Sequence, residues 1–517
     1  MHQEADSNLI LQWIRKIRPQ AWVVFFSAVI FGIVCQGMGL TNKYSRYDDI
    51  HYLFDMGGTV VLGRWMLHVL GWLEGLFFGT GNASLPLFNG LLSLLMIGAA
   101  GALLADLLEI RNKLYCALLG CLMAAFPFLT ALFAYMFTSH YYMFALLMIV
   151  ICACLICRRN AWWVKGIAVL AGGASVGIYQ AFIPVLLSVL LIYDLKTVSR
   201  EGASLPAFFR QIGLQALCVA GVMAVYFAGN SFFLAKFGVE LSGYQGIEGM
   251  GSGTLQVYLE RCARAYREFL NPTPGFFQDM YPGTLHILYT AALAGNVLLA
   301  VRQAVKTGRE SRLRMILLLM LYALVPLGCN FIYVMTETVH ALMVYGEIMQ
   351  FVLLVWQLDR LELSSRRLNQ AVCAAASLML GVMNVMYARF DNQCYLKAEF
   401  QQQQAISYNT TLITQIKSLE GYRPELPLYI IHPWVLTDPT VYNMKELDFI
   451  QLLPYNYETS KALHIFGDFT QRWCGFTVNL YEGDLNLESL PEVQAMPAYP
   501  ADGSIRIIRD VIVVKMS

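Results

Sequence analysis

Long apolar stretches separated by short polar segments fill the first three quarters of the chain. A helix rises 1.5 Å per residue, so about 20 apolar residues can cross a hydrocarbon core of ~30 Å. We therefore predict an α-helical polytopic membrane protein with about eleven transmembrane helices. Segment 162–195 is counted as two helices, although one long tilted helix is the alternative. The predicted helices lie near residues 22–40, 85–108, 114–134, 140–157, 162–178, 180–195, 211–233, 284–301, 315–335, 337–357 and 369–388.

Basic residues predict which ends of these helices face the cytoplasm, because cytoplasmic loops carry an excess of Lys and Arg. With eleven helices, the basic clusters all fall on the side that holds the N-terminus. The opposite side receives loop 41–84, loop 234–283 and everything after residue 388. A single crossing at 162–195 would move the later loops to the other side. The clusters are Arg15, Lys16 and Arg18; Arg111 and Lys113; Arg158 and Arg159; Lys196 and Arg200; Arg302, Lys306, Arg309, Arg312 and Arg314; and Arg360, Arg366 and Arg367.

The composition changes abruptly after residue 388, where polar residues and short strand-like or helix-like segments replace the apolar stretches. We therefore expect a transmembrane domain over 1–388 and a small soluble α/β domain over 389–517 on the extracytoplasmic side. Segments 427–431, 463–466 and 505–515 are its candidate regular elements.

Composition agrees with a lipid environment, since 57% of residues are hydrophobic and 14% are charged. The formal net charge of +1 gives no reason to expect a nucleic acid partner. Most of the twelve cysteines lie inside apolar stretches, where thiols act as small packing residues. The sequence contains no Walker A motif, His-Glu-x-x-His motif or nucleophile elbow, which argues against the use of ATP.

Loop 41–84 concentrates ionisable and aromatic side chains at a membrane face. Asp48 and Asp49 point to opposite sides if the backbone is extended, so one can face a substrate while the other takes a structural partner. A carboxylate in a partly dry cavity can act as a general base, and its neighbour could hold Arg46, Arg64 or a divalent cation. The alternative is that both aspartates cap a helix that begins near Ile50.

The apolar segment 57–78 is interrupted by Arg64, His68 and Glu74, which suits a helix lying in the membrane interface. Arg64 and His68 are four residues apart and share a helix face, where a guanidinium can bind phosphate oxygens in bidentate fashion. Simple anchoring of Arg64 and Trp65 at the headgroup level is the alternative.

Three further groups lie at predicted outer ends of helices, and each has a structural alternative. The first group could line the same cavity as Asp48 or belong to an aromatic belt. The second could bind sugar hydroxyls or satisfy the hydrogen bonds of a bent backbone. The third could be functional or form the start of a helix. They are Tyr135, Thr138, Ser139, His140, Tyr141 and Tyr142; Tyr179 and Gln180; and Thr336, Glu337 and His340.

Four short motifs, in this order and spacing, resemble the bacterial membrane glucosyltransferase family of the phage serotype-converting (Gtr) type, which is usually grouped with the GT-C glycosyltransferases. The resemblance covers most of residues 20–400. The motifs are Tyr47-Asp48-Asp49 after the first helix; Gly63-Arg64-Trp65; Phe126-Pro127 with Tyr135 and the His140 region; and Gly177-Ile178-Tyr179-Gln180.

The resemblance implies an enzyme of the bacterial cytoplasmic membrane that moves a sugar, typically glucose, from an undecaprenyl-phosphate carrier to a cell-surface glycan. Asp48 or Asp49 would deprotonate the acceptor hydroxyl, and Arg64, assisted by His140 or His340, would stabilise the leaving phosphate. The two aspartates could hold Mg²⁺ or Mn²⁺, but we expect no metal because Arg64 could replace it. The residues expected to contact substrate are Tyr47, Trp65, Tyr135, Tyr141, Tyr179, Gln180 and Glu337.

Three other functions stay open at this point. A transporter or flippase of lipid-linked glycans would carry charges along several helices, whereas here the ionisable residues gather at one membrane face. Another GT-C sugar transferase or a glycan polymerase would share these features. A scaffold whose C-terminal domain binds the cell wall is the third alternative.

Overall fold

The computed structural model describes residues 17–44, 47–52, 59–79, 83–242, 253–271, 283–431 and 459–516. The chain divides into two compact units, which are described separately. Unit 1 comprises Met1–Thr41 and Phe54–Asn392, and unit 2 comprises Asn42–Leu53 and Gln393–Ser517. The second unit therefore includes part of the first predicted outer loop as well as the C-terminal segment.

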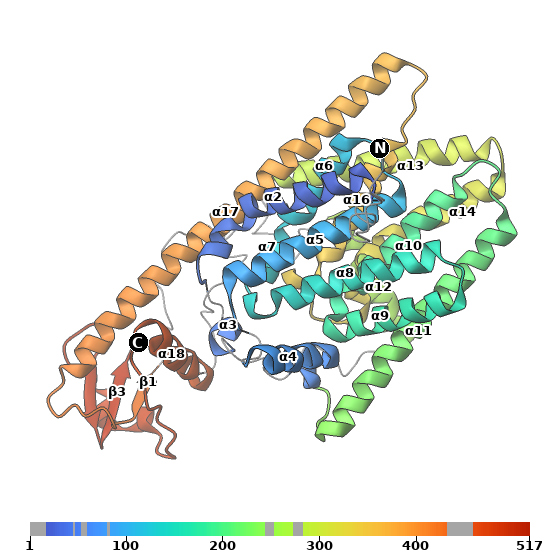
Figure 1. Ribbon diagram of the computed structural model, residues 1–517. Helices are drawn as coiled ribbons and strands as arrows, with labels where there is room; N and C mark the ends of the chain where they lie inside the picture. Colours follow the sequence, from blue (N-terminus) through green and yellow to red (C-terminus); the bar gives the residue numbers. More distant parts are fainter. Residues whose placement is uncertain are drawn as a thin grey trace, which may run out of the picture. The chain divides into compact units, whose positions relative to one another are not determined.

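Unit 1 is built from helices and short 3-10 turns (Figure 1). Its longest helix, α17 (Arg366–Lys417), continues past Asn392 into unit 2. The other elements are α2 (Pro19–Thr41), η1 (Val60–Leu62), α4 (Trp65–Phe78), α5 (Pro86–Leu108), α6 (Lys113–Ala125), α7 (Pro127–Phe133), α8 (Met136–Arg158), α9 (Trp162–Ile178), η2 (Gln180–Phe182), α10 (Ile183–Val198), α11 (Leu205–Phe237), α12 (Leu255–Leu270), α13 (Gly283–Gly308), α14 (Arg312–Cys329), α15 (Ile332–Met335), η4 (Ala341–Met343), η5 (Tyr345–Ile348) and α16 (Met349–Asp359).

In the described part of the chain, eight helices are long and apolar enough to cross a membrane, or nine if α6 and α7 form one bent span. The expected number of eleven is therefore too high. Segment 162–195 does form two helices, but α9 has only 17 residues. Segment 337–357 is broken into η4, η5 and the 11-residue α16, so its apolar composition does not make one long helix. Pro127 breaks the third predicted span between α6 and α7, because proline has no backbone N–H to donate to the preceding turn.

Small residues allow the first helices of unit 1 to approach closely. A Cβ atom on Gly120 of α6 would lie 2.4 Å from the backbone oxygen of Val24 in α2, so only glycine fits there. Without a hydrophobic driving force between helices in lipid, such close contact of backbones is a main source of helix association.

Charged residues from segments far apart in the sequence meet at one end of unit 1. The carboxylate of Glu109, after α5, lies 3.0 Å from Nζ of Lys196, 3.2 Å from Arg200 and 3.3 Å from Arg360. Burial alone would raise the pKa of Glu109, but these cations, Lys196 foremost, bring it below its ordinary value. Residues from two basic clusters that the charge pattern assigned to one side of the membrane thus bind the same carboxylate.

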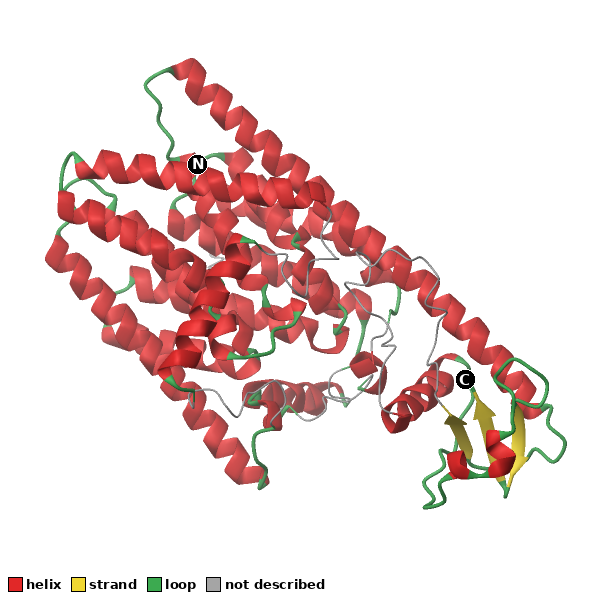
Figure 2. Cartoon of the chain, turned by 180° about the vertical axis from the view of Figure 1, so that it is seen from behind, coloured by secondary structure: helices red, strands yellow, loops and turns green. Residues whose placement is uncertain are grey.

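Unit 2 contains a three-stranded sheet in the order β1-β3-β2, seen in yellow in Figure 2. The strands are β1 (Leu428–Ile431), β2 (Ile505–Ile508) and β3 (Val511–Lys515); β1 pairs with β3 in parallel, and β2 pairs with β3 antiparallel. The candidate segment 463–466 lies in helix α18 (Thr459–Trp473), whose apolar face packs on the sheet through Leu463 and Phe466. The second unit is therefore a small α/β fold.

Candidate functional site

The Gly63-Arg64-Trp65 motif forms the junction between η1 and α4. Gly63 ends η1 with a φ of +70°, a conformation that side chains rarely adopt. A Cβ atom there would also lie 2.6 Å from the Tyr226 hydroxyl and 3.0 Å from Nε2 of Gln180. Both the backbone conformation and the space therefore require glycine at this position.

Trp65 fixes the start of α4 by filling a slot between two other helices. Cβ atoms added to Gly177 of α9 and Gly229 of α11 would lie 2.6 Å and 2.4 Å from its indole ring. The ring also stacks on Phe233 of α11, with centroids 5.7 Å apart. The structure thus gives Trp65 a packing role, and its expected contact with substrate stays a prediction.

Arg64 lies against two tyrosines that stack on each other. Its Nη1 donates a hydrogen bond of 2.9 Å to the Tyr142 hydroxyl, and its guanidinium carbon lies 5.4 Å from the ring centroid of Tyr179. The rings of Tyr142 and Tyr179 are 4.2 Å apart and nearly parallel. A guanidinium on aromatic faces is held in one orientation while it keeps its charge.

The motif at residues 177–180 completes this arrangement. Nε2 of Gln180 donates to the carbonyl of Leu62 at 3.0 Å and lies 3.2 Å from the Tyr226 hydroxyl. We call Arg64, Tyr142, Tyr179, Gln180 and Tyr226 the arginine–tyrosine cluster. Two motifs that are more than 100 residues apart in the sequence thus meet in one place.

A second group lies further along α4. The Tyr141 hydroxyl donates a hydrogen bond to the Glu74 carboxylate, and Nε2 of His140 lies 3.6 Å from the same carboxylate. Tyr141 and Tyr142 are neighbours on α8. Tyr141 therefore contacts Glu74 of α4, and Tyr142 contacts Arg64, the N-cap residue of the same helix. His140 and Tyr141 were expected from the sequence, whereas Glu74 was noted only as an interruption of an apolar segment.

Asp48 and Asp49 lie in unit 2, on the short helix α3 (Tyr47–His51). The expected extended backbone is wrong here, and the helix begins three residues before Ile50. The Asp49 side chain is fully buried and forms an ion pair with Lys43, and burial lowers the pKa of that lysine to about 7. Asp48 is partly exposed. Asp49 thus takes a structural partner, and Asp48 is the better candidate base.

The surroundings of α3 belong to the same unit. Nδ1 of His51 lies 2.7 Å from Asp468 of α18, so the helix with the two aspartates packs on the C-terminal segment. The side chains of Arg46 and Tyr47 lie outside the described residues. Arg64, the other expected partner of the aspartates, belongs to unit 1.

The remaining predicted residues lie around the broken segment 336–343 and the start of α8. Tyr179 donates from its hydroxyl to the carbonyl of Leu342 at 3.1 Å, which brings the segment that contains His340 beside the arginine–tyrosine cluster. Glu337 is exposed, and its backbone carbonyl accepts a hydrogen bond from Arg264. Tyr135 is the N-cap residue of α8.

Buried polar residues that the sequence analysis missed lie between the helices of unit 1. Gln36 of α2 donates from Nε2 to Asp391 at 3.3 Å and to Thr130 at 3.2 Å, and all three side chains are buried. The predicted last span ended at residue 388, just short of Asp391. Within the described ranges, no group of three His, Cys, Asp or Glu residues could hold a metal ion, so the question of Mg²⁺ or Mn²⁺ at Asp48 and Asp49 stays open.

Fold and site define a multi-pass helical membrane protein with a cation, carboxylates and aromatic rings fixed between its helices. Residues 37–351, more than half of the chain, match the family described as Glucosyl transferase GtrII. The chain belongs to this family and is therefore a glycosyltransferase, which confirms the resemblance seen in the sequence. No curated protein and no solved structure matches the chain.

Proposed function

We propose that the protein transfers glucose from an undecaprenyl-phosphate carrier to a cell-surface glycan outside the cytoplasmic membrane. The observation that carries this proposal is the guanidinium of Arg64, fixed on Tyr142 and Tyr179 where two of the motifs meet. A polyprenyl phosphate places its anionic group at headgroup level with its chain between helices. A fixed cation between apolar helices suits such a group better than a water-soluble nucleotide sugar.

In the proposed reaction, an acceptor hydroxyl attacks the anomeric carbon and the bond from that carbon to the phosphate oxygen breaks. The phosphodiester donor leaves as a phosphate monoester, which gains one negative charge. Arg64 stabilises this charge, with His140 or His340 assisting. The acceptor proton goes to a carboxylate, for which Asp48 is the first candidate. Glu74 is the second, since it lies beside His140 on α4, the helix whose N-cap residue is Arg64.

The test is transfer of radiolabelled glucose from polyprenyl-phosphate-glucose to cell-wall glycan by the purified full chain. Removal of one stabilising donor typically lowers turnover by about 10²–10³-fold, so we expect such a loss for Arg64→Gln. Asp48→Asn should lower it by about 10²–10⁴-fold if Asp48 is the base, and Glu74→Gln should do so if Glu74 is. Arg210→Gln, at an exposed position of α11, is the matched control.

Undiminished transfer by Arg64→Gln would refute the assignment of phosphate binding. Transfer of another hexose, but not glucose, would refute the donor. Movement of labelled lipid across vesicles without transfer would favour the flippase alternative. Loss of activity with EDTA, restored by Mg²⁺ or Mn²⁺, would show that a metal is required.

A further inference from the structure

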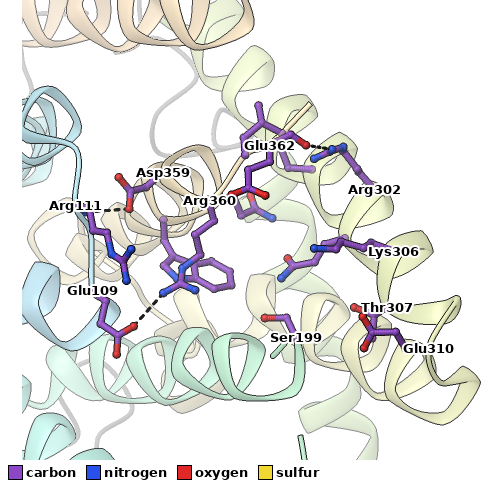
Figure 3. Close-up of a pocket in the computed structure, with 15 residues that line it drawn as sticks. Glu109, Arg111, Ser199, Arg302, Lys306, Thr307, Glu310, Asp359, Arg360 and Glu362 are labelled. Carbon is purple, nitrogen blue, oxygen red and sulfur yellow. Dashed lines mark hydrogen bonds and ion pairs between the residues drawn. The ribbon is translucent and has the colours of Figure 1, made fainter. Parts of the chain in front are cut away.

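A polar cavity of about 370 Å³ opens at the charged end of unit 1 (Figure 3). Four basic residues from three segments line it: Arg111 before α6, Arg302 and Lys306 on α13, and Arg360 after α16. The proposed reaction does not use any of them. Cavities of this size commonly hold small ligands or headgroups.

Most carboxylates of the cavity already have partners. Both oxygens of Asp359 accept backbone N–H groups, from Arg111 at 2.9 Å and Asn112 at 2.8 Å. Glu109 lies within 3.3 Å of three cations, and Glu310 forms an ion pair of 2.9 Å with Arg314.

Arg302, in contrast, donates to the backbone carbonyl of Glu362, which carries no charge. Lys306 lies 3.5 Å from Glu201, but both side chains are largely exposed and the pair is weak. The cavity therefore offers Arg111, Arg302 and Lys306 to an anion, with Glu362 as the remaining acid.

The helix that supplies two of these cations also presents apolar side chains next to them. Leu298, Val301 and Val305 of α13 are 70%, 52% and 53% exposed. Their spacing of three and four residues puts them on one face of the helix, beside Arg302 and Lys306. An exposed apolar face on a membrane helix contacts acyl chains, so a phosphate at the two cations would have its chains on this face.

We propose that this cavity binds the phosphodiester headgroup of an anionic phospholipid. Basic pockets between helices at the cytoplasmic side of membrane proteins bind such headgroups. The basic loops predict that this end faces the cytoplasm, where the leaflet is rich in anionic lipid. The exposed apolar face favours a lipid over free phosphate as the source of the anion.

The experiment counts lipids bound to the purified, delipidated full chain by native mass spectrometry during titration with phosphatidylglycerol. The double variant Arg302→Gln/Lys306→Gln removes two cations of the cavity. Its matched control, Arg309→Gln/Arg312→Gln, removes the same charge at exposed positions that do not line the cavity. Thermal unfolding without lipid checks that both variants are folded.

A cation that holds an anionic headgroup contributes about 1 kcal/mol, so the cavity variant, which loses two such cations, should bind about 10- to 30-fold more weakly. The control residues lie outside the cavity, and their loss should change binding by less than about twofold. Equal binding by cavity variant and control would overturn the proposal. So would equal binding of phosphatidylcholine by the wild type. Displacement of the lipid by millimolar inorganic phosphate would show a site for a free anion instead. None of these measurements depends on glucosyl transfer, so failure here is separate from failure of the proposed function.

Discussion

The slot for Trp65 between Gly177 and Gly229 gives the sharpest test of how the arginine–tyrosine cluster is positioned. In Gly177→Ala, the new methyl carbon would lie 2.6 Å from Trp65. Carbon atoms pack at about 3.5–4.0 Å, so the indole must move by about 1 Å. Overpacking of this kind costs about 1–3 kcal/mol. Because Arg64 is the neighbour of Trp65, the same shift displaces the guanidinium.

We expect Gly177→Ala to lower both the thermal stability in detergent and the rate of glucosyl transfer. A displacement of about 1 Å in an active site can cost about 10²-fold in rate. Gly166→Ala is the matched control, because it lies on the same helix and a Cβ atom there meets nothing within 4 Å. That control should be neutral or stabilise slightly, since alanine favours a helix by about 0.5–1 kcal/mol.

A double-mutant cycle separates the clash from a general effect of alanine. Trp65→Leu removes the ring, so Gly177→Ala should cost less in that background, with a coupling energy of about 1–2 kcal/mol. The measurements are initial transfer rates and thermal unfolding, the latter followed by a signal other than tryptophan fluorescence because one variant lacks Trp65. If Gly177→Ala behaves like Gly166→Ala in both assays, the slot does not position Arg64 and the reasoning is wrong.

Three further variants and one fusion test other parts of the structure. Asp49→Asn should lower stability by about 3 kcal/mol because it leaves Lys43 buried without its ion pair, whereas Asp48→Asn should lower transfer and leave the melting temperature unchanged. The ion pairs of Glu109 stabilise the fold above its ordinary pKa and are lost as the pH falls through the lowered value; Glu109→Gln should therefore melt earlier than wild type at pH 7 and show a smaller further loss toward pH 3. Alkaline phosphatase fused to the C-terminus should be active in intact bacteria, because nine spans, with α6 and α7 counted as one, place that end opposite the cytoplasmic N-terminus; an inactive but folded fusion would contradict this topology.

Hydrophobic pattern alone predicted most helices of unit 1, since length and apolar composition decide membrane insertion. It overestimated the number of spans where apolar segments do not form one long helix. Segment 337–357 is as apolar as a span, yet it folds into two 3-10 turns and the short helix α16. Its breaks are set by tertiary contacts such as the hydrogen bond from Tyr345 to the carbonyl of Met123, which no local pattern reveals.

The sequence predicted individual residues of the candidate site but not which of them contact one another. Arg64, Tyr179 and Gln180 were all chosen from short motifs, and they do come together. Tyr226 was missed because a buried tyrosine in an apolar helix looks like a packing residue. Glu74 was passed over because a single carboxylate in an interfacial helix has no sequence partner; its partners, His140 and Tyr141, are 66 and 67 residues away.

The division of the chain gives the C-terminal segment a role that its sequence does not suggest. Residues 42–53 carry the candidate base Asp48, and they fold with residues 393–517. Within that unit, His51 binds Asp468, and the ring of Tyr44 lies over Tyr395. The segment after residue 392 therefore supports the helix that presents Asp48, although the family match ends at residue 351.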